Sequence, residues 1–177
     1  MEKLIFENEE YYFNKGVVYD SSFLEVPLVV AQKVLKEYYS AIDYKELAED
    51  KYLQCVHDLK KSGFHGKCLD VAKQGLEKFP LSMSFAKAVF PIISSCHRFL
   101  GQSQKSIDYW KQSRGKYSVC LSPELLTSLA AAYCDVGDLD SAERCVKKAY
   151  SMQGGSMGYQ NELSLVYLRL EKERKAK

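Results

Sequence analysis

Residues 125–150 constrain the fold most, because they predict two antiparallel helices joined by one tight turn. Apolar residues recur at helical spacing on both sides of that turn: Leu126, Leu129, Ala130 and Tyr133, then Ala142, Val146 and Ala149. Gly137 can adopt the left-handed backbone that ends a helix, and Asp138 or Asp140 can cap the next one. The alanines at 130, 131 and 142 allow the two helix axes to approach closely.

Residues 126–149 resemble the tetratricopeptide repeat (TPR). They match its order of residue types: large, Leu, small, Tyr, Gly-Asp, Ala, large and Ala. That repeat is a helix-turn-helix unit of about 34 residues which stacks into solenoids. The resemblance implies a concave groove lined by the first helix of each unit. It says little about the ligand, because such repeats bind many partners.

Two earlier units can be traced from the same turn position. Gly63 and Gly101 occupy the position that Gly137 has in the clearest unit. Gly63 lies 38 residues before Gly101, and Gly101 lies 36 residues before Gly137. Pro91 falls inside the first helix of the middle unit and should kink it. After the Gly154-Gly155 pair, a last helix from about Tyr159 to Lys172 is expected to cap the stack, and the tail beyond it to fray. The predicted fold is therefore all-α: a short right-handed α-solenoid of about three TPR-like helical hairpins plus a C-terminal capping helix.

Residues 1–45 differ in character and form a predicted N-terminal extension to a repeat domain spanning 46–177. Short aromatic or β-branched runs are separated by turn signals, which favours either a small β-meander or an extended arm along the solenoid. A helix is expected to begin at Pro27 and to pack against a helix from Tyr44 to Lys61.

Composition excludes several classes of protein. The 177 residues carry a net charge of only +2, which does not favour a nucleic-acid partner. No window approaches the roughly 18 unbroken apolar residues of a membrane-spanning helix. The six cysteines are scattered and fall largely within apolar helix stripes, so we expect reduced core thiols and a cytoplasmic protein.

Two motifs suggest chemistry, but their context argues against it. Residues 154–158 match G-x-S-x-G, yet they lie between predicted helices and no histidine follows position 97. Cys55, His57, His65 and Cys68 offer four possible zinc ligands, but bringing them together would break the helix pairing. We therefore predict no enzyme activity, no metal and no cofactor.

The candidate ligand groove is instead lined by inner-face positions of the first helices. These residues are Asp50, Leu53, His57, Lys60, Ser95, Arg98, Glu124, Thr127, Ala131 and Cys134. Lys60 and Arg98 could meet an acidic group on a peptide, although cations near helix ends also favour the helix dipole. The clamp by which some TPR domains bind the C-terminal carboxylate of chaperones is not expected, because Glu124 replaces a cation.

The leading hypothesis is a non-enzymatic scaffold that binds a protein or peptide in this groove. Two alternatives stay open. One is a dedicated client chaperone or assembly factor, similar in size and repeat number to type III secretion chaperones. The other is an RNA-binding helical repeat, and a homodimer is compatible with each of the three.

Overall fold

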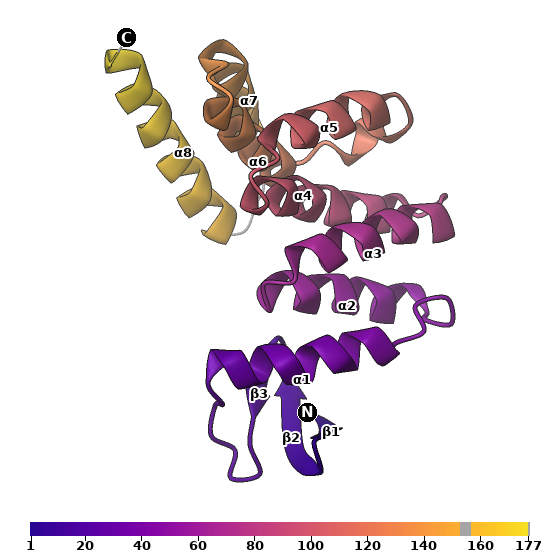
Figure 1. The fold of residues 1–177 in the computed structure, drawn as a ribbon. Helices are drawn as coiled ribbons and strands as arrows, with labels where there is room; N and C mark the ends of the chain where they lie inside the picture. Colours follow the sequence, from indigo (N-terminus) through magenta and orange to yellow (C-terminus); the bar gives the residue numbers. More distant parts are fainter. Residues whose placement is uncertain (153–156, 177) are drawn as a thin grey trace.

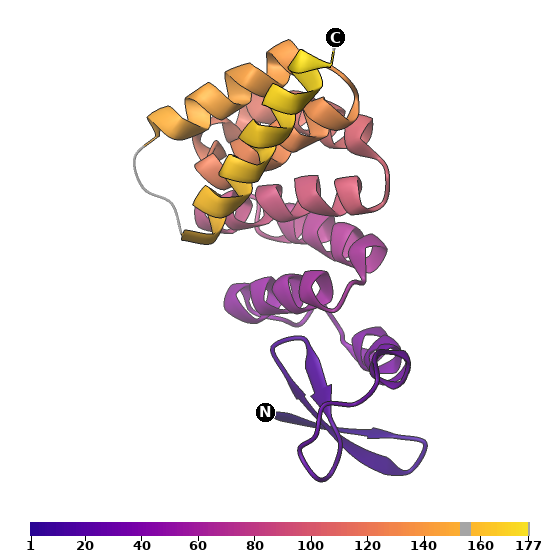
Figure 2. The same cartoon turned by 90° about the vertical axis from the view of Figure 1, so that its left-hand side faces the viewer.

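The computed structural model describes residues 1–152 and 157–176 as a small β-sheet followed by a stack of helices (Figure 1). The sheet and the first helix lie at one end of the stack, and the C-terminal helix lies at the other. Seen from the side, the helices of successive hairpins rise one above the next (Figure 2). This arrangement confirms the predicted all-α solenoid with short N-terminal strands.

The N-terminal sheet is an antiparallel meander of β1 (Glu2–Phe6), β2 (Glu9–Asn14) and β3 (Val17–Tyr19). Its two tight turns contain Asn8 and Gly16 in the left-handed conformation, as two-residue hairpin turns require. Alternate residues, including Tyr11, Phe13 and Val18, are buried on one face. The meander is thus the correct choice between the two predicted alternatives.

Helix α1 (Leu28–Ala41) starts directly after Pro27 and joins the sheet to the first hairpin. The Tyr39 ring packs against Phe13 of β2, at a centroid distance of 6.1 Å, and against Phe64 after the next helix, at 5.7 Å. The core is therefore continuous from the sheet into the helical stack.

Three helical hairpins follow: α2 (Glu49–Lys61) with α3 (His65–Lys78), α4 (Met83–Phe99) with α5 (Ser103–Tyr117), and α6 (Pro123–Asp135) with α7 (Leu139–Ser151). A short 3-10 turn, η1 (Ser118–Cys120), precedes α6. Helix α2 begins five residues later than predicted. The Asp43 carboxylate accepts the backbone N–H of Lys45, and such a local bond competes with helix formation.

The same turn closes all three hairpins. Gly63, Gly101 and Gly137 have φ values of 80°, 68° and 79°. In each turn the residue after the glycine donates its N–H to a carbonyl five residues earlier: Phe64 to Leu59, Gln102 to His97 and Asp138 to Tyr133, at 2.8–3.0 Å. This is the Schellman closure of a helix, and it confirms the predicted register of the three units.

Hydrogen bonds cross the buried seams of the first and middle hairpins. Val56 faces Cys68, whose thiol donates to the Val56 carbonyl. In the middle hairpin the hydroxyls of Ser94 and Ser106 are hydrogen-bonded at 2.7 Å. All four side chains are buried, and so are the alanines at 130, 131 and 142 that predicted a close approach in the third hairpin.

Helix α8 (Met157–Lys175) is longer than predicted at both ends. The residues expected to fray are held by ion pairs, because Arg174 reaches Asp140 at 3.0 Å and Glu143 at 2.7 Å on α7. Leu163 and Leu170 are buried against the last hairpin.

Pro91 lies within a continuous helix, since α4 extends eight residues beyond it.

Two further observations concern the cysteines and the membrane. All six cysteines are free thiols, four of them buried. Among the described helices, none combines the length and apolar character needed to cross a membrane.

The packing between the first two hairpins yields a prediction at Gly75. A Cβ atom there would lie 2.5 Å from Phe85 Cζ and 2.7 Å from Tyr52 Cε1. We expect Gly75→Ala to lower the free energy of unfolding by about 1–3 kcal/mol, measured by urea denaturation. Gly66→Ala on the same helix is the matched control, because its Cβ meets nothing within 4 Å. An equal loss in both variants would contradict the described packing.

Candidate functional site

A cavity of about 840 Å³ lies along the inner side of the stack. Its walls come from the first helix of each hairpin and from α8. The lining residues are His57 and Lys60 of α2; Ser84, Lys87, Ala88, Pro91, Ile92, Ser95 and Arg98 of α4; Ser122, Glu124, Thr127, Ser128 and Ala131 at or on α6; and Glu162, Leu165, Val166 and Arg169 of α8.

Seven of the ten groove residues proposed from the sequence line this cavity: His57, Lys60, Ser95, Arg98, Glu124, Thr127 and Ala131. They lie on three successive first helices, which places them together although up to 74 residues separate them in the chain (57 to 131). The structure therefore brings most of the proposed set to one surface.

The other three proposed residues do not line the cavity. Asp50 lies in the first turn of α2, whereas the cavity is bounded by the C-terminal half of that helix. Leu53 packs against the main hydrophobic core. Cys134 is 3% exposed and is covered by Leu170 of α8. We correct the groove set by removing these residues.

Sequence reasoning missed the contribution of α8, which was expected only to cap the stack. Leu165 and Val166 supply apolar surface, and Glu162 and Arg169 supply charge. A signal was present, because Leu163 and Tyr167 repeat the spacing of Leu129 and Tyr133 in α6. Helix α8 is thus placed like the first helix of a further unit and extends the groove.

Part of the cavity wall is apolar. Ala88, Pro91 and Ile92 of α4 line it, as do Leu165 and Val166 of α8. Pro91 has no backbone N–H, so the carbonyl of Lys87 receives no bond from it in the helix ladder. The cavity wall therefore combines an aliphatic surface with a backbone acceptor.

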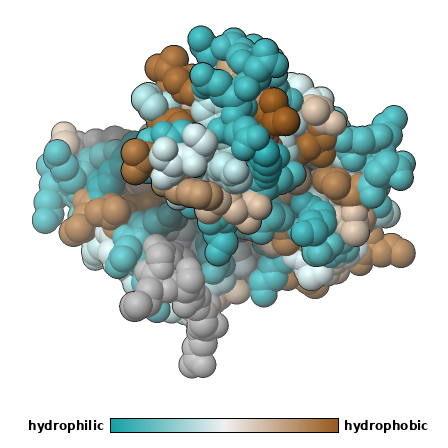
Figure 3. Space-filling model, turned by 90° about the horizontal axis from the view of Figure 1, so that it is seen from below, coloured by the Kyte–Doolittle hydropathy of each residue, from teal (hydrophilic) through white to brown (hydrophobic). Residues whose placement is uncertain are grey.

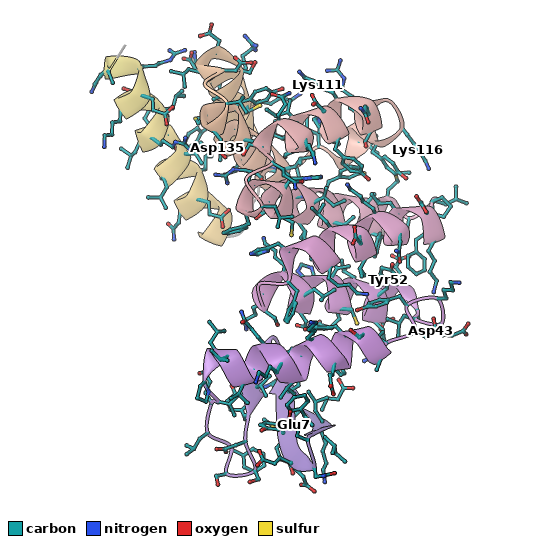
Figure 4. All side chains as sticks on the ribbon, viewed as in Figure 1. Glu7, Asp43, Tyr52, Lys111, Lys116 and Asp135 are labelled. Atoms are coloured by element: carbon teal, nitrogen blue, oxygen red, sulfur yellow. The ribbon has the colours of Figure 1, made fainter. Side chains whose placement is uncertain are left out.

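One edge of the cavity is organised by Asp135, the last residue of α6. Figure 4 shows this residue in the space between α8 and the α4–α6 stack. Its carboxylate accepts hydrogen bonds from Arg98 Nε at 2.9 Å, Arg169 Nη1 at 2.5 Å and Ser103 Oγ at 2.7 Å. Glu173 accepts a further bond from Arg169 Nε at 2.6 Å. Four helices are joined at this point.

Burial of Asp135 raises its pKa, but the hydrogen bonds from Arg169, Arg98 and Ser103 outweigh that effect and hold the pKa below its usual range. Hydrogen bonding to Asp135 likewise raises the pKa of Arg169. Both groups are charged at neutral pH. The two guanidinium groups therefore stay fixed beside the cavity.

Lys60, Lys87 and His57 are the remaining basic groups on the wall. Neither lysine has a carboxylate within ion-pair distance among the described residues. Desolvation, followed by the neighbouring Lys60 ammonium, lowers the pKa of His57. Its imidazole is thus neutral near pH 7, and the lysines supply unpaired positive charge.

The structure does not assemble the zinc site weighed from the sequence. His65 stacks on Phe99 at 4.4 Å, and its Nδ1 lies 3.9 Å from the Cys96 sulfur. His57 instead lines the cavity. Within residues 1–152 and 157–176, no group of three or more His, Cys, Asp or Glu side chains is placed to hold a metal ion. The Gly154–Ser156 part of the G-x-S-x-G match lies outside the described residues.

Comparison with known proteins adds one structural likeness. No protein-family model matches the chain, and no curated protein matches it. Among solved structures, the C-terminal TPR-containing domain of a Plasmodium falciparum protein described as FK506-binding is similar, at 16% identity and a TM-score of 0.49. The match covers 75% of this chain and 99% of that one. The three equivalent glycine turns and the repeated helical hairpins define the fold. The fold is a TPR-like helical repeat.

The Asp135 junction predicts a pH-dependent contribution to stability. We expect Asp135→Asn to lower the free energy of unfolding by about 1 kcal/mol at pH 7, because two charge-assisted bonds weaken. Since the folded pKa is lowered, this contribution is present above the unfolded pKa of about 4 and disappears as pH falls through the folded pKa. Urea denaturation from pH 7 to pH 2.5 measures the difference.

Asp140→Asn is the control for this prediction. Asp140 pairs with Arg174, but the side chain of Asp140 is 82% exposed. The loss of unfolding free energy in Asp140→Asn should therefore stay below about 0.5 kcal/mol. If the difference in unfolding free energy between wild type and Asp135→Asn is the same at pH 2.5 as at pH 7, the role assigned to Asp135 is contradicted.

Proposed function

We propose that this protein is a non-enzymatic scaffold that binds an extended segment of a partner protein in the cavity between α2, α4, α6 and α8. The supporting observation is the lining of the cavity, whose walls come from four helices that pack one on the next: α2 on α4, α4 on α6 and α6 on α8. Packed helices lie roughly 8–10 Å apart, so four span about 24–30 Å. At about 3.3 Å per residue, that length suits seven to nine residues of extended chain.

The wall offers the kinds of contact that a peptide needs. Aliphatic side chains of the partner would pack on Ala88, Pro91 and Ile92, where burial of apolar surface supplies affinity. The carbonyl of Lys87 could accept a hydrogen bond from the peptide backbone. Because the walls are helices joined by buried seams, the surface is formed before the ligand arrives, which limits the entropic cost of binding.

We propose no catalytic role for the cavity. His57 is the single histidine among its described lining residues, and no described hydrogen bond joins its ring to a carboxylate or a nucleophile. Catalytic acid–base groups need a positioned partner at hydrogen-bond distance. The cytoplasmic location, the homodimer, the client chaperone and the RNA-binding function stay predictions, because no contact described above favours them.

Peptide selection tests this proposal. Random 12-residue peptides displayed on phage are selected on the wild-type protein, and the enriched peptides are measured by fluorescence polarisation. Ser95 lines the cavity, and Ser95→Tyr adds a ring to its wall, so we expect affinity to fall at least tenfold. Gln74→Tyr adds the same ring on the exposed surface of α3, outside the cavity, and should leave affinity within twofold.

Two results would overturn the proposal. One is the absence of any enriched peptide that distinguishes wild type from Ser95→Tyr. The other is equal loss of affinity in Ser95→Tyr and Gln74→Tyr, which would indicate a general effect of the substitution. Circular dichroism of both variants verifies that the helices are retained.

A further inference from the structure

We infer that the partner segment is acidic, and that its carboxylates are recognised by a row of three cations on one edge of the groove: Lys60 of α2, Arg98 of α4 and Arg169 of α8. This inference rests on the proposed function and names the chemistry of the partner. It differs from the chaperone-type carboxylate clamp, because the row lies near the C-terminal ends of α2 and α4 and includes a helix outside the three hairpins.

Arg98 and Arg169 form the fixed part of this row. Both donate to the same carboxylate, that of Asp135, so their guanidinium groups lie side by side. Both line the cavity, whereas Asp135 does not. Asp135 therefore fixes the two arginines through its hydrogen bonds without itself lining the cavity, and its negative charge offsets the repulsion between them. It is a positioning residue.

Hydrogen-bond donors remain available on this edge. Arg98 uses Nε for Asp135, and no described contact engages its two terminal nitrogens. A guanidinium group presents its donors in a planar fork that matches a carboxylate. The side chain of Arg98 is 30% exposed, so an incoming carboxylate can reach it.

Lys60 occupies the equivalent place one hairpin earlier. It lies three residues before Gly63, as Arg98 lies three residues before Gly101, and both face the cavity. Neighbouring first helices are roughly 8–10 Å apart, a distance that two successive acidic residues of a peptide can bridge. Lys60 has no ion-pair partner among the described residues, so its charge is available to a ligand.

The opposite edge has a different balance of charge. Glu124 lies in the first turn of α6, and Glu162 lies near the start of α8, with Lys87 as the cation of that side. Two carboxylates against one ammonium disfavour an acidic ligand there, whereas the three cations of the first edge outnumber Asp135 and Glu173 beside them. The difference between the edges should orient the bound segment with its acidic side chains toward Arg98.

Helix dipoles alone do not explain the arrangement. Cations in the last turns of α2 and α4 are favoured by the dipole, but Arg169 lies in the interior of α8. Asp135 is an anion at the C-terminal end of α6, where the dipole is unfavourable. Its position is explained by the two arginines that it holds beside the cavity.

The experiment uses the same random 12-residue phage library on three forms of the full chain: wild type, Lys60→Glu and the double variant Lys60→Glu/Arg98→Glu. We expect wild type to enrich peptides with an excess of Asp and Glu. A fluorescein-labelled acidic winner should lose at least tenfold affinity in Lys60→Glu, and its wild-type affinity should fall as salt is raised from 50 to 300 mM. The double variant should enrich basic peptides instead.

Lys51→Glu is the matched control, since Lys51 is an exposed residue of α2 outside the cavity and should keep affinity within twofold. Lys60→Glu removes no described ion pair, so its effect does not depend on the Asp135 junction. Two results would overturn this inference and leave the proposed function standing. One is that the groove-dependent peptides are neutral or basic. The other is that acidic peptides bind Lys60→Glu as tightly as they bind wild type. A lack of any groove-dependent peptide would overturn both.

Discussion

The left-handed turn at Gly63, Gly101 and Gly137 is the constraint on which the rest of the structure depends. A side chain at these φ values is strained, so glycine reverses the chain there at little cost. Each reversal sets two helices antiparallel and brings small residues face to face in the seam. Because the three turns are equivalent, the first helices fall on one side of the stack, and their inner faces form one wall.

This constraint explains which features the sequence could predict. The turn glycines and the small residues beside them are local signals, so the hairpins and their register followed from spacing alone. Short aromatic runs in residues 1–19 indicated strands but left an extended arm open. The meander is favoured because Tyr11, Phe13 and Val18 alternate toward one buried face, and that face needs α1 to cover it.

The composition of the groove was only partly predictable. His57, Ser95 and Ala131 share one register position on three helices, so periodicity alone placed them. Leu53 and Cys134 satisfy the same periodicity, yet the core and α8 cover them. The pairing of Asp135 with Arg98 and Arg169 spans 37 and 34 residues and depends on how α8 lies across the stack. Such long-range geometry has no local signature.

The end of the molecule that carries the sheet differs in surface character from the cavity wall. Viewed from the end that carries the sheet, the surface is largely hydrophilic with separated apolar patches (Figure 3). Among the exposed apolar side chains, Phe23 lies in the segment that leads into α1, and Leu28 and Val29 lie in the first turn of that helix. Single exposed apolar residues are common on soluble proteins, whereas a cavity walled by four helices is not.

We propose that a partner binds to the inner wall of the stack and not to the outer helices. Amide chemical-shift mapping tests this directly, by titrating a selected peptide into the ¹⁵N-labelled protein. We predict that the largest shifts fall on α4 and α6 around Ala88, Ser95 and Ala131, with further shifts near Leu165. Shifts concentrated on α3, α5 and α7, with the inner residues unchanged, would contradict the claim.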